Sequence, residues 1–318
     1  MKEFRISGIQ LVRYTAENQV EWNTLVAKSR NGTFLINRSY MDYHADRFQD
    51  CSFLVFKKKV LEAIIPGNRQ GDVFYSHQGL TYGGVISTEN ITTVDMLEIF
   101  RLLNDRLRQE SCSTVVYKPV PAIYHQMPAE EDLYALFRDH AKLIARQISS
   151  AIYQANKIPF IGSRKSGLRK ATRYSVQVQE CKEFCVFWEI LSDILMSRYT
   201  ANPVHSLKEI EVLHQRFPEK IKLHVAVVND RVVAGVVMYL NERVAHVQYI
   251  ATNEKGKQCG ALDMIFDQLV NVVYPSIPVF EFGASTEKGG LLLNESLIFQ
   301  KEGFGGRGTV YDTYEYSL

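Results

Sequence analysis

Cysteine, tryptophan and long hydrophobic runs are scarce in this sequence. Its 318 residues include two tryptophans and five cysteines, at positions 51, 112, 181, 185 and 259. Five cysteines cannot all pair, and none belongs to the matched Cys or His doublets that a zinc site needs. We therefore expect reduced thiols, mostly buried, and no bound metal.

The charge has no excess of either sign. Lysine and arginine number 37 against 35 acidic residues, a formal net charge of +2. This balance predicts neither a nucleic acid nor a membrane surface as partner. No apolar run reaches the roughly 20 residues that span a bilayer, and residues 1–20 lack the apolar core of a signal peptide. We expect a cytoplasmic protein without a membrane span; the oligomeric state is left open.

The chain is long enough for two domains, each with its own core. Hydrophobic residues make up 46% of it and charged residues 23%, as in globular proteins. Hydrophobic periodicity predicts helices interspersed on mostly antiparallel sheets in both halves, a mixed α/β class. The predicted domains are residues 1–155 and 156–318, each with helices before a hairpin-rich sheet and a helix after it.

Residues 221–260 are the most informative stretch of the chain. Three β-branched strands, 221–228, 231–240 and 244–251, are separated by two short polar turns. A polar loop, 252–259, then leads through Gly260 into a helix. Free amides at such a helix start could hold the pyrophosphate of an acyl carrier. A connection that only needs glycine explains the same residues equally well.

Two further segments contain candidate substrate-binding residues. Residues 73–87 combine three glycines with His77, Gln78 and Tyr82, a composition typical of ligand-binding loops and also of a tight buried loop. Residues 164–173 contain five cations, of which Arg169 and Arg173 would share a helix face with Lys165. Such a cluster can bind phosphate or carboxylate groups, or form a solvated basic helix.

The order of elements in residues 221–316 resembles the GNAT acyltransferase fold. The loop EKGKQCGALD resembles that family's pyrophosphate loop, with Lys257 at the basic position and Gly260 at the first glycine. Leu262 occupies the last position, where a small residue is usual. Two segments resemble the FemAB-like branch, FEFGASTEKGGLLLNESLIFQKEGFGGR (280–307) and RKATRYSV (169–176). In them Glu281 replaces an aspartate, one residue is inserted before Lys301, and Ser175 replaces a glycine.

The resemblance implies two tandem GNAT-like domains and transfer of an acyl or aminoacyl group to an amine. FemAB enzymes use aminoacyl-tRNA to extend peptidoglycan peptides, whereas other relatives use acyl-CoA on small amines or amino sugars. Our leading hypothesis is an N-acyltransferase that uses acetyl-CoA or another acyl-CoA, with a small amine, an amino sugar or a cell-wall precursor as acceptor. The alternatives are aminoacyl transfer from tRNA and a non-catalytic ligand-binding protein.

The transfer needs a neutral amine, a stabilised oxyanion and a protonated leaving group. His246 is a candidate general base, and Glu281 on a neighbouring strand is another. Strand alternation places His246 and Gln248 on the face opposite Val247 and Tyr249. Candidate roles for the remaining residues are proton donation to the thiolate by Tyr249, stabilisation of negative charge or phosphate by Lys301, and donor binding by Lys257 and the amides of Cys259, Gly260 and Ala261. Each of these residues has an ordinary structural explanation as well.

Overall fold

The computed structural model describes residues 8–318, and the chain divides into two compact units. Unit 1 contains the described residues through Gln147 together with Lys288–Leu291 and Val310–Leu318. Unit 2 contains Ile148–Glu287 and Leu292–Thr309. Two long strands, β9 (Lys142–Tyr153) and β17 (Arg307–Ser317), therefore contribute residues to both units. The predicted boundary after residue 155 remains a prediction.

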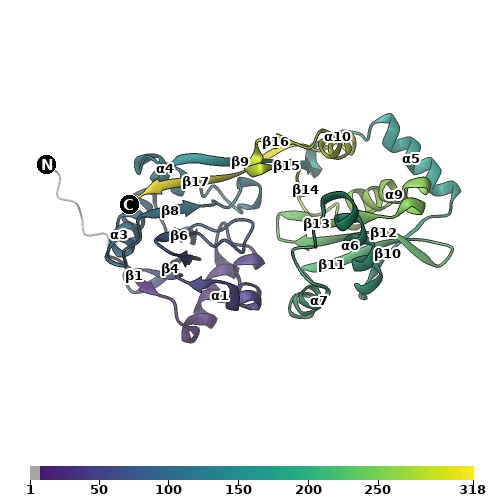
Figure 1. Ribbon diagram of the computed structural model, residues 1–318. Helices are drawn as coiled ribbons and strands as arrows, with labels where there is room; N and C mark the ends of the chain where they lie inside the picture. The colour runs from purple at the N-terminus through teal and green to yellow at the C-terminus, as the bar shows by residue number, and fades with distance from the viewer. Residues whose placement is uncertain (1–7) are drawn as a thin grey trace. The chain divides into compact units, whose positions relative to one another are not determined.

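Unit 1 is built on β-sheet structure with helices packed against it (Figure 1). One antiparallel sheet has the strand order β1-β3-β4-β7, and a second set of strands runs β17-β8-β6-β5-β2. The strands are β1 (Ile9–Arg13), β2 (Gln49–Asp50), β3 (Phe53–Lys57), β4 (Val60–Ile65), β5 (Asn68–Gln70), β6 (Val73–Tyr75), β7 (Ile86–Ser87) and β8 (Thr114–Tyr117). The helices are α1 (Gln19–Lys28), α2 (Arg38–Met41), α3 (Thr93–Gln109) and α4 (Glu131–Arg138).

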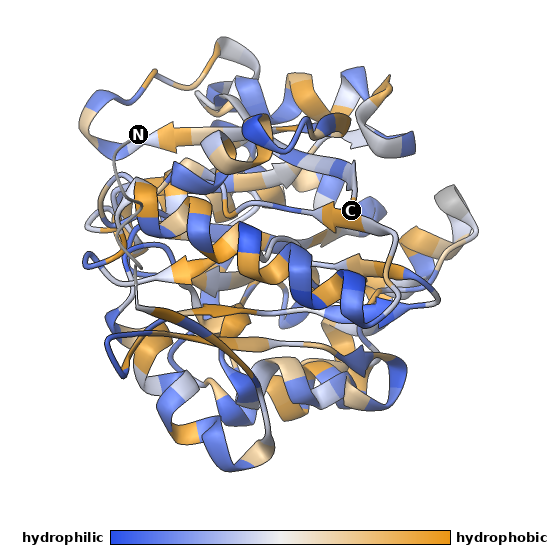
Figure 2. Cartoon of the chain, turned by 90° about the vertical axis from the view of Figure 1, so that its left-hand side faces the viewer, coloured by the Kyte–Doolittle hydropathy of each residue, from blue (hydrophilic) through white to orange (hydrophobic). Residues whose placement is uncertain are grey.

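Helix α3 illustrates why these residues fold as they do. Thr92 and Asp95 form a capping box at its N-terminus, which satisfies two backbone amides that a helix start otherwise leaves free. Its apolar face, including Ile99, Phe100 and Leu103, is buried in the core of unit 1. Figure 2 shows hydrophobic and hydrophilic residues alternating along the helices of this unit, as amphipathic helices require.

Unit 2 has the strand order β10-β11-β12-β13-β14-β9. Its strands are β10 (Gln177–Cys181), β11 (Ile221–Val228), β12 (Arg231–Leu240), β13 (Val244–Thr252), β14 (Val279–Ala284), β15 (Thr286–Glu287) and β16 (Leu292–Leu293). Its helices are α5 (Gly162–Arg173), α6 (Cys185–Tyr199), α7 (Leu207–Arg216), α8 (Glu254–Cys259), α9 (Ala261–Gln268) and α10 (Glu295–Gly303). The predicted class, mixed α/β with mostly antiparallel sheets, is confirmed.

Helices α6 and α9 cover opposite faces of this sheet (Figure 1). Ala234 and Val236 of β12 are buried in the same core as Ile265 and Phe266 of α9. Gly235, between them, lies directly under Phe187 of α6, whose ring a Cβ at that position would meet at 2.4 Å. Since successive strand residues point to opposite faces, the two helices sandwich the sheet.

One local prediction was wrong. The predicted polar loop at 252–259 is mostly helix α8, because Asn253 caps it by accepting a hydrogen bond from the Gly256 amide (2.9 Å). Helix α10 starts only at Glu295. Before it, β15 and β16 form a hairpin in which Gly289 and Gly290 have φ of 66° and 99°, which a right-handed helix does not allow.

Candidate functional site

The centre of the candidate site is the point where β13 and β14 separate. The two strands pair in parallel over three residue pairs only, and the last pair is His246 with Glu281. Beyond that pair β13 continues to Thr252 and β14 to Ala284 without further pairing to each other in the described chain. The opening between the strands leaves backbone groups that a continuous sheet would have paired.

A β-bulge adjoins this opening. Val237 of β12 pairs with Tyr249 and the next residue, Met238, pairs with Val247, so Gln248 is an extra residue on β13. The bulge overturns the predicted facing of this strand. Val247 is buried in the core beneath α9, whereas Tyr249 packs on Trp188 of α6 (ring centroids 5.1 Å apart). Simple alternation fails here because the extra residue reverses the pattern.

His246 and Glu281 form a buried acid–base pair. His246 Nδ1 is hydrogen-bonded to one carboxylate oxygen of Glu281, while the other accepts hydrogen bonds from the Ser149 hydroxyl and from the Gly283 amide (2.8 Å). Burial by itself would raise the pKa of Glu281, but His246 and these hydrogen bonds outweigh burial and hold the pKa below its ordinary value. Glu281 is inaccessible to solvent and His246 is 13% exposed, so only the imidazole can meet a substrate.

Lys301 completes this polar cluster from helix α10. Its ammonium donates to the carbonyl oxygens of Gly283 (2.7 Å) and Ala284 (2.8 Å), which follow Glu281 on β14. Burial lowers the pKa of Lys301 to about 8, and the negative charge of Glu281 opposes that shift. An ammonium has three donors, so these two carbonyls leave one for a ligand.

Tyr249 lies apart from this cluster. Its hydroxyl is hydrogen-bonded to Nδ1 of His205 (2.6 Å) and accepts the backbone amide of the same residue (3.2 Å). The tyrosine is 9% exposed. Its predicted role as proton donor remains a prediction, and the structure supplies His205 as a partner that the sequence did not indicate.

The predicted donor-binding residues surround the start of α9. Gly260 has φ of 73° and joins α8 to α9, and its amide already donates to the carbonyls of Gly256 and Lys257. A Cβ at Gly260 would lie 2.5 Å from the carbonyl oxygen of Gly167 in α5. Cys259 is fully buried, and burial raises its thiol pKa. Glycine at 260 thus has a structural cause, and the amides available to an anion are those of α9 from Ala261 onward.

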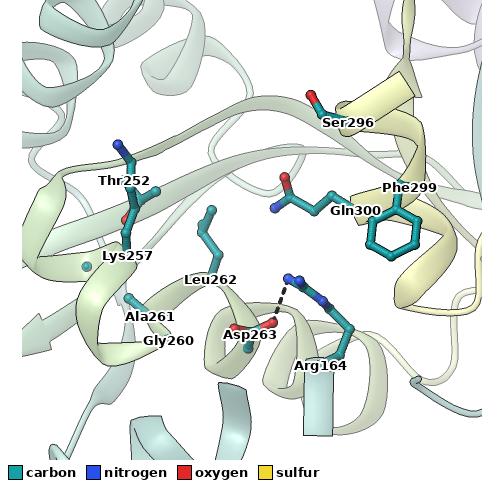
Figure 3. A pocket seen from close by; sticks show the side chains of 11 residues that line it. Arg164, Thr252, Lys257, Gly260, Ala261, Leu262, Asp263, Ser296, Phe299 and Gln300 are labelled. Carbon is teal, nitrogen blue, oxygen red and sulfur yellow. Dashed lines mark hydrogen bonds and ion pairs between the residues drawn. The ribbon is translucent and has the colours of Figure 1, made fainter. Parts of the chain in front are cut away.

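A cavity of about 430 Å³ opens in front of this helix start (Figure 3). Lys257, Gly260 and Ala261 line it, and Cys259 does not. The cavity also contains an ion pair that the sequence prediction missed, Arg164 of α5 with Asp263 of α9 (2.9 Å). Burial raises the pKa of Asp263, and Arg164 opposes that shift.

Arg169 and Arg173 are exposed on α5 and do not line this cavity. The sequence signal that identifies Arg164 instead is its spacing of three residues from Gly167. Gly167 packs against Asp263 so closely that a Cβ there would meet the carboxylate at 2.0 Å. Residues three apart share a helix face, so the face that carries the small residue against α9 also carries the arginine.

The candidate residues of unit 1 are held in place by neighbours. Gln78 and Asn68 exchange hydrogen bonds through side chain and backbone (2.7 Å each), and Tyr82 donates to Thr33 (3.1 Å). His77 is buried with φ of 76°, and burial followed by the proximity of His44 lowers its pKa to about 3. These contacts explain the composition of the loop, and substrate binding by the three residues remains a prediction.

Within residues 8–318, no helix combines the length and apolarity needed to cross a membrane. The same residues contain no group of three or more His, Cys, Asp or Glu side chains placed to hold a metal ion. All five cysteines are free; Cys51, Cys112 and Cys259 are buried.

Comparison with solved structures identifies the fold. FemX superposes with a TM-score of 0.67 at 11% identity, covering 97% of each chain. The C-terminal domain (DUF2156) of a putative lysylphosphatidylglycerol synthetase from Agrobacterium fabrum gives 0.62 at 10% identity, over 95% of this chain and 92% of that one. L-PGS from Bacillus licheniformis gives 0.52 at 12% identity, over 96% and 92%. No family model matches the sequence, and no curated protein is significantly similar to it. The chain therefore shares the fold of these structures, in agreement with the GNAT/FemAB-like fold that the sequence motifs indicated.

Proposed function

We propose that this protein is an N-acyltransferase that moves an acyl group from acyl-CoA to an amine. The observation that carries the proposal is the opening between β13 and β14, with an acid–base pair where the strands part and a cavity at the start of α9. An acyl thioester laid along this opening would have its phosphates near α9 and its carbonyl near the paired strands. Acetyl-CoA is the simplest such donor.

In this mechanism the amine nitrogen attacks the thioester carbonyl, the C–N bond forms and the C–S bond breaks. His246 takes the proton that the amine loses, and Glu281 orients the imidazole through Nδ1 and balances its positive charge. The ammonium of Lys301 stabilises the negative charge that develops on the carbonyl oxygen. Tyr249 is the candidate donor of the proton that the departing thiolate takes up.

At the other end of the donor, Arg164 and Lys257 supply charge for the pyrophosphate, together with the free amides at the start of α9. Arg164 would exchange part of its contact with Asp263 for the phosphate oxygens. His77, Gln78, Tyr82, Arg169 and Arg173 remain candidates for binding the acceptor, which we propose is a small amine, an amino sugar or a cell-wall precursor.

The test is isothermal titration of the full chain with acetyl-CoA. Gly260 is a poor position for a loss-of-binding variant, because any side chain there meets the Gly167 carbonyl. Arg164→Ala and Lys257→Ala are better, and each should weaken binding about tenfold or more, since a hydrogen bond to a charged group contributes about 1.5 kcal/mol or more. Lys165→Ala is the matched control, because Lys165 is exposed on the same helix and does not line the cavity. Absence of acetyl-CoA binding, or equal loss in all three variants, contradicts the proposed donor site.

A second candidate is transfer from aminoacyl-tRNA, which the FemAB-like resemblance favours. Arg169 and Arg173, exposed on α5, would contact the tRNA backbone. Binding of charged tRNA should then fall steeply with salt, and Arg169→Ala or Arg173→Ala should reduce the slope of that dependence. Binding of neither donor would favour a non-catalytic ligand-binding protein.

A further inference from the structure

A second cavity, of about 440 Å³, continues the one at the start of α9. The two cavities share four lining residues, Thr252, Lys257, Leu262 and Gln300, and Figure 3 shows all four around the first cavity. They therefore form one continuous groove. Its second part runs between the ends of β13 and β14 and helix α6.

The two ends of this groove differ in chemistry. The first contains Arg164, Lys257 and the N-terminus of α9, which suit an anion. The second is lined mainly by aliphatic side chains from four different elements: Leu191, Ile194, Leu195, Ile250, Leu262 and Leu297. A groove that is cationic at one end and aliphatic at the other complements a molecule with an anionic head and an aliphatic tail.

Two hydroxyl groups in the aliphatic part have no partner. Among the described residues, Ser285 Oγ and Thr286 Oγ1 are buried side-chain atoms without a hydrogen bond, and both residues line the cavity. Ser285 is 1% exposed. Buried hydroxyls are normally satisfied, so a ligand that brings polar groups to this part of the groove would supply partners if the two side chains turn toward it. The carbonyl and amide groups of a thioester donor are of that kind.

We propose that the second cavity binds the aliphatic chain of an acyl donor, and that the preferred acyl group is longer than acetyl. The proposal rests on the proposed acyl transfer and adds the class of acyl group. A two-carbon group would leave the aliphatic walls in contact with water, whereas each methylene buried there should tighten binding about fourfold. The chain would lie against Leu191, Ile194 and Leu195 of α6 while Ser285 donates to the carbonyl or amide that follows it.

The experiment compares acetyl-, hexanoyl- and decanoyl-CoA by isothermal titration to the full chain. The wild type should bind hexanoyl-CoA at least tenfold more tightly than acetyl-CoA. Leu195→Trp, which fills the cavity, should remove this preference and leave acetyl-CoA binding unchanged. Val186→Trp is the control, because Val186 is 45% exposed on the same helix and does not line the cavity. Ile194→Trp provides a second filling variant in case the first does not fold.

Failure of this inference differs from failure of the proposed function. If all three donors bind equally well, or if both filling variants keep the preference for long chains, the aliphatic site is wrong and the transferase proposal stands. If no acyl-CoA binds, the CoA donor is wrong, and decanoyl-pantetheine, which lacks the phosphates, tests the cavity alone. If decanoyl-pantetheine binds to the wild type and to Val186→Trp but not to Leu195→Trp, the site for the aliphatic chain is supported. If it does not bind to the wild type, the proposed site is overturned.

Discussion

At the scale of single residues, the pair His246–Glu281 is the proposed acid–base pair of the site. Glu281 is fully buried, and three hydrogen-bonding groups surround its carboxylate, which makes it an orienting partner for an imidazole. The sequence offered both residues as alternative bases. Their difference in exposure favours His246 as the base, because a base must reach the amine it deprotonates.

We predict that His246→Ala lowers kcat of acyl transfer by about 10²- to 10⁴-fold, the usual contribution of a positioned general base. Added imidazole should restore part of the activity. His224→Ala serves as control, since this buried histidine lies on β11 of the same sheet and bonds only Tyr274 among the described contacts (2.6 Å). Full activity in His246→Ala would exclude His246 as the base.

The pKa of Lys301 gives a prediction for pH dependence. Because burial lowers this pKa to about 8, the ammonium is present at pH 7 and loses its proton as the pH rises through about 8. If its charge stabilises the oxyanion, kcat/KM falls above that pH. Lys301→Arg should keep a flat profile to higher pH, because arginine stays protonated. An unchanged alkaline fall in this variant would assign it to another group.

Burial of the Lys301 ammonium also affects stability. The folded-state pKa lies below the unfolded value of 10.5, so the unfolded chain binds more protons between about pH 8 and pH 10.5. The cost of burying the charge is therefore present at pH 7 and is removed as the pH rises through that interval. Under the proposed function, this cost would be offset by a positive charge close to the acyl carbonyl.

At the scale of elements, the junction of α8, α9 and α5 shows how one glycine shapes the proposed donor site. Gly260 needs a positive φ, and it also lies against the backbone of Gly167. Because Gly260 has no side chain, α5 can pack closely against this point of the chain. The packing of α5 on α9 places Arg164 beside Asp263. Of the five cations in residues 164–173, Arg164 lines the cavity because of how α5 packs on α9.

We predict that Gly260→Ala destabilises unit 2 by about 1–2 kcal/mol from the left-handed backbone alone, with about 1–3 kcal/mol more from the clash. Gly71→Ala is the matched control, since Gly71 has φ of 63° and a Cβ there would meet nothing within 4 Å. Urea denaturation of both variants measures the difference. Equal destabilisation would mean that α5 moves aside at no cost.

At the scale of the whole molecule, each unit has its own hydrophobic core. The core around Phe100 and Leu103 consists of residues of unit 1, and that around Phe266 and Phe304 consists of residues of unit 2. Separate cores allow separate unfolding transitions, and a ligand stabilises only the unit to which it binds.

The two tryptophans make this testable, because Trp22 belongs to unit 1 and Trp188 to unit 2, and both are buried. In Trp188→Phe fluorescence reports unit 1, and in Trp22→Phe it reports unit 2. We predict that acyl-CoA shifts the unfolding midpoint more in Trp22→Phe than in Trp188→Phe. Equal shifts would show that the units unfold together.

The fold class and the three strands of residues 221–251 could be predicted from the sequence. The β-branched runs of 221–251 favour strands at that spacing, and the motifs around Glu281 and Lys301 indicated a GNAT/FemAB-like fold. The sequence also indicated His246, Glu281 and Lys301 as candidate site residues, because their residue types suit acyl transfer.

Which of these side chains meet could not be predicted, because it depends on how distant segments pack. Ser149 reaches Glu281 from β9, more than 130 positions earlier, and Arg164 reaches Asp263 from another helix. The bulge at Gln248 turned Tyr249 away from Val247, and Asn253 converted a predicted loop into a helix. Most of these features depend on strand register or on helix packing. Both are set by contacts between distant segments, which local hydrophobic periodicity does not reveal.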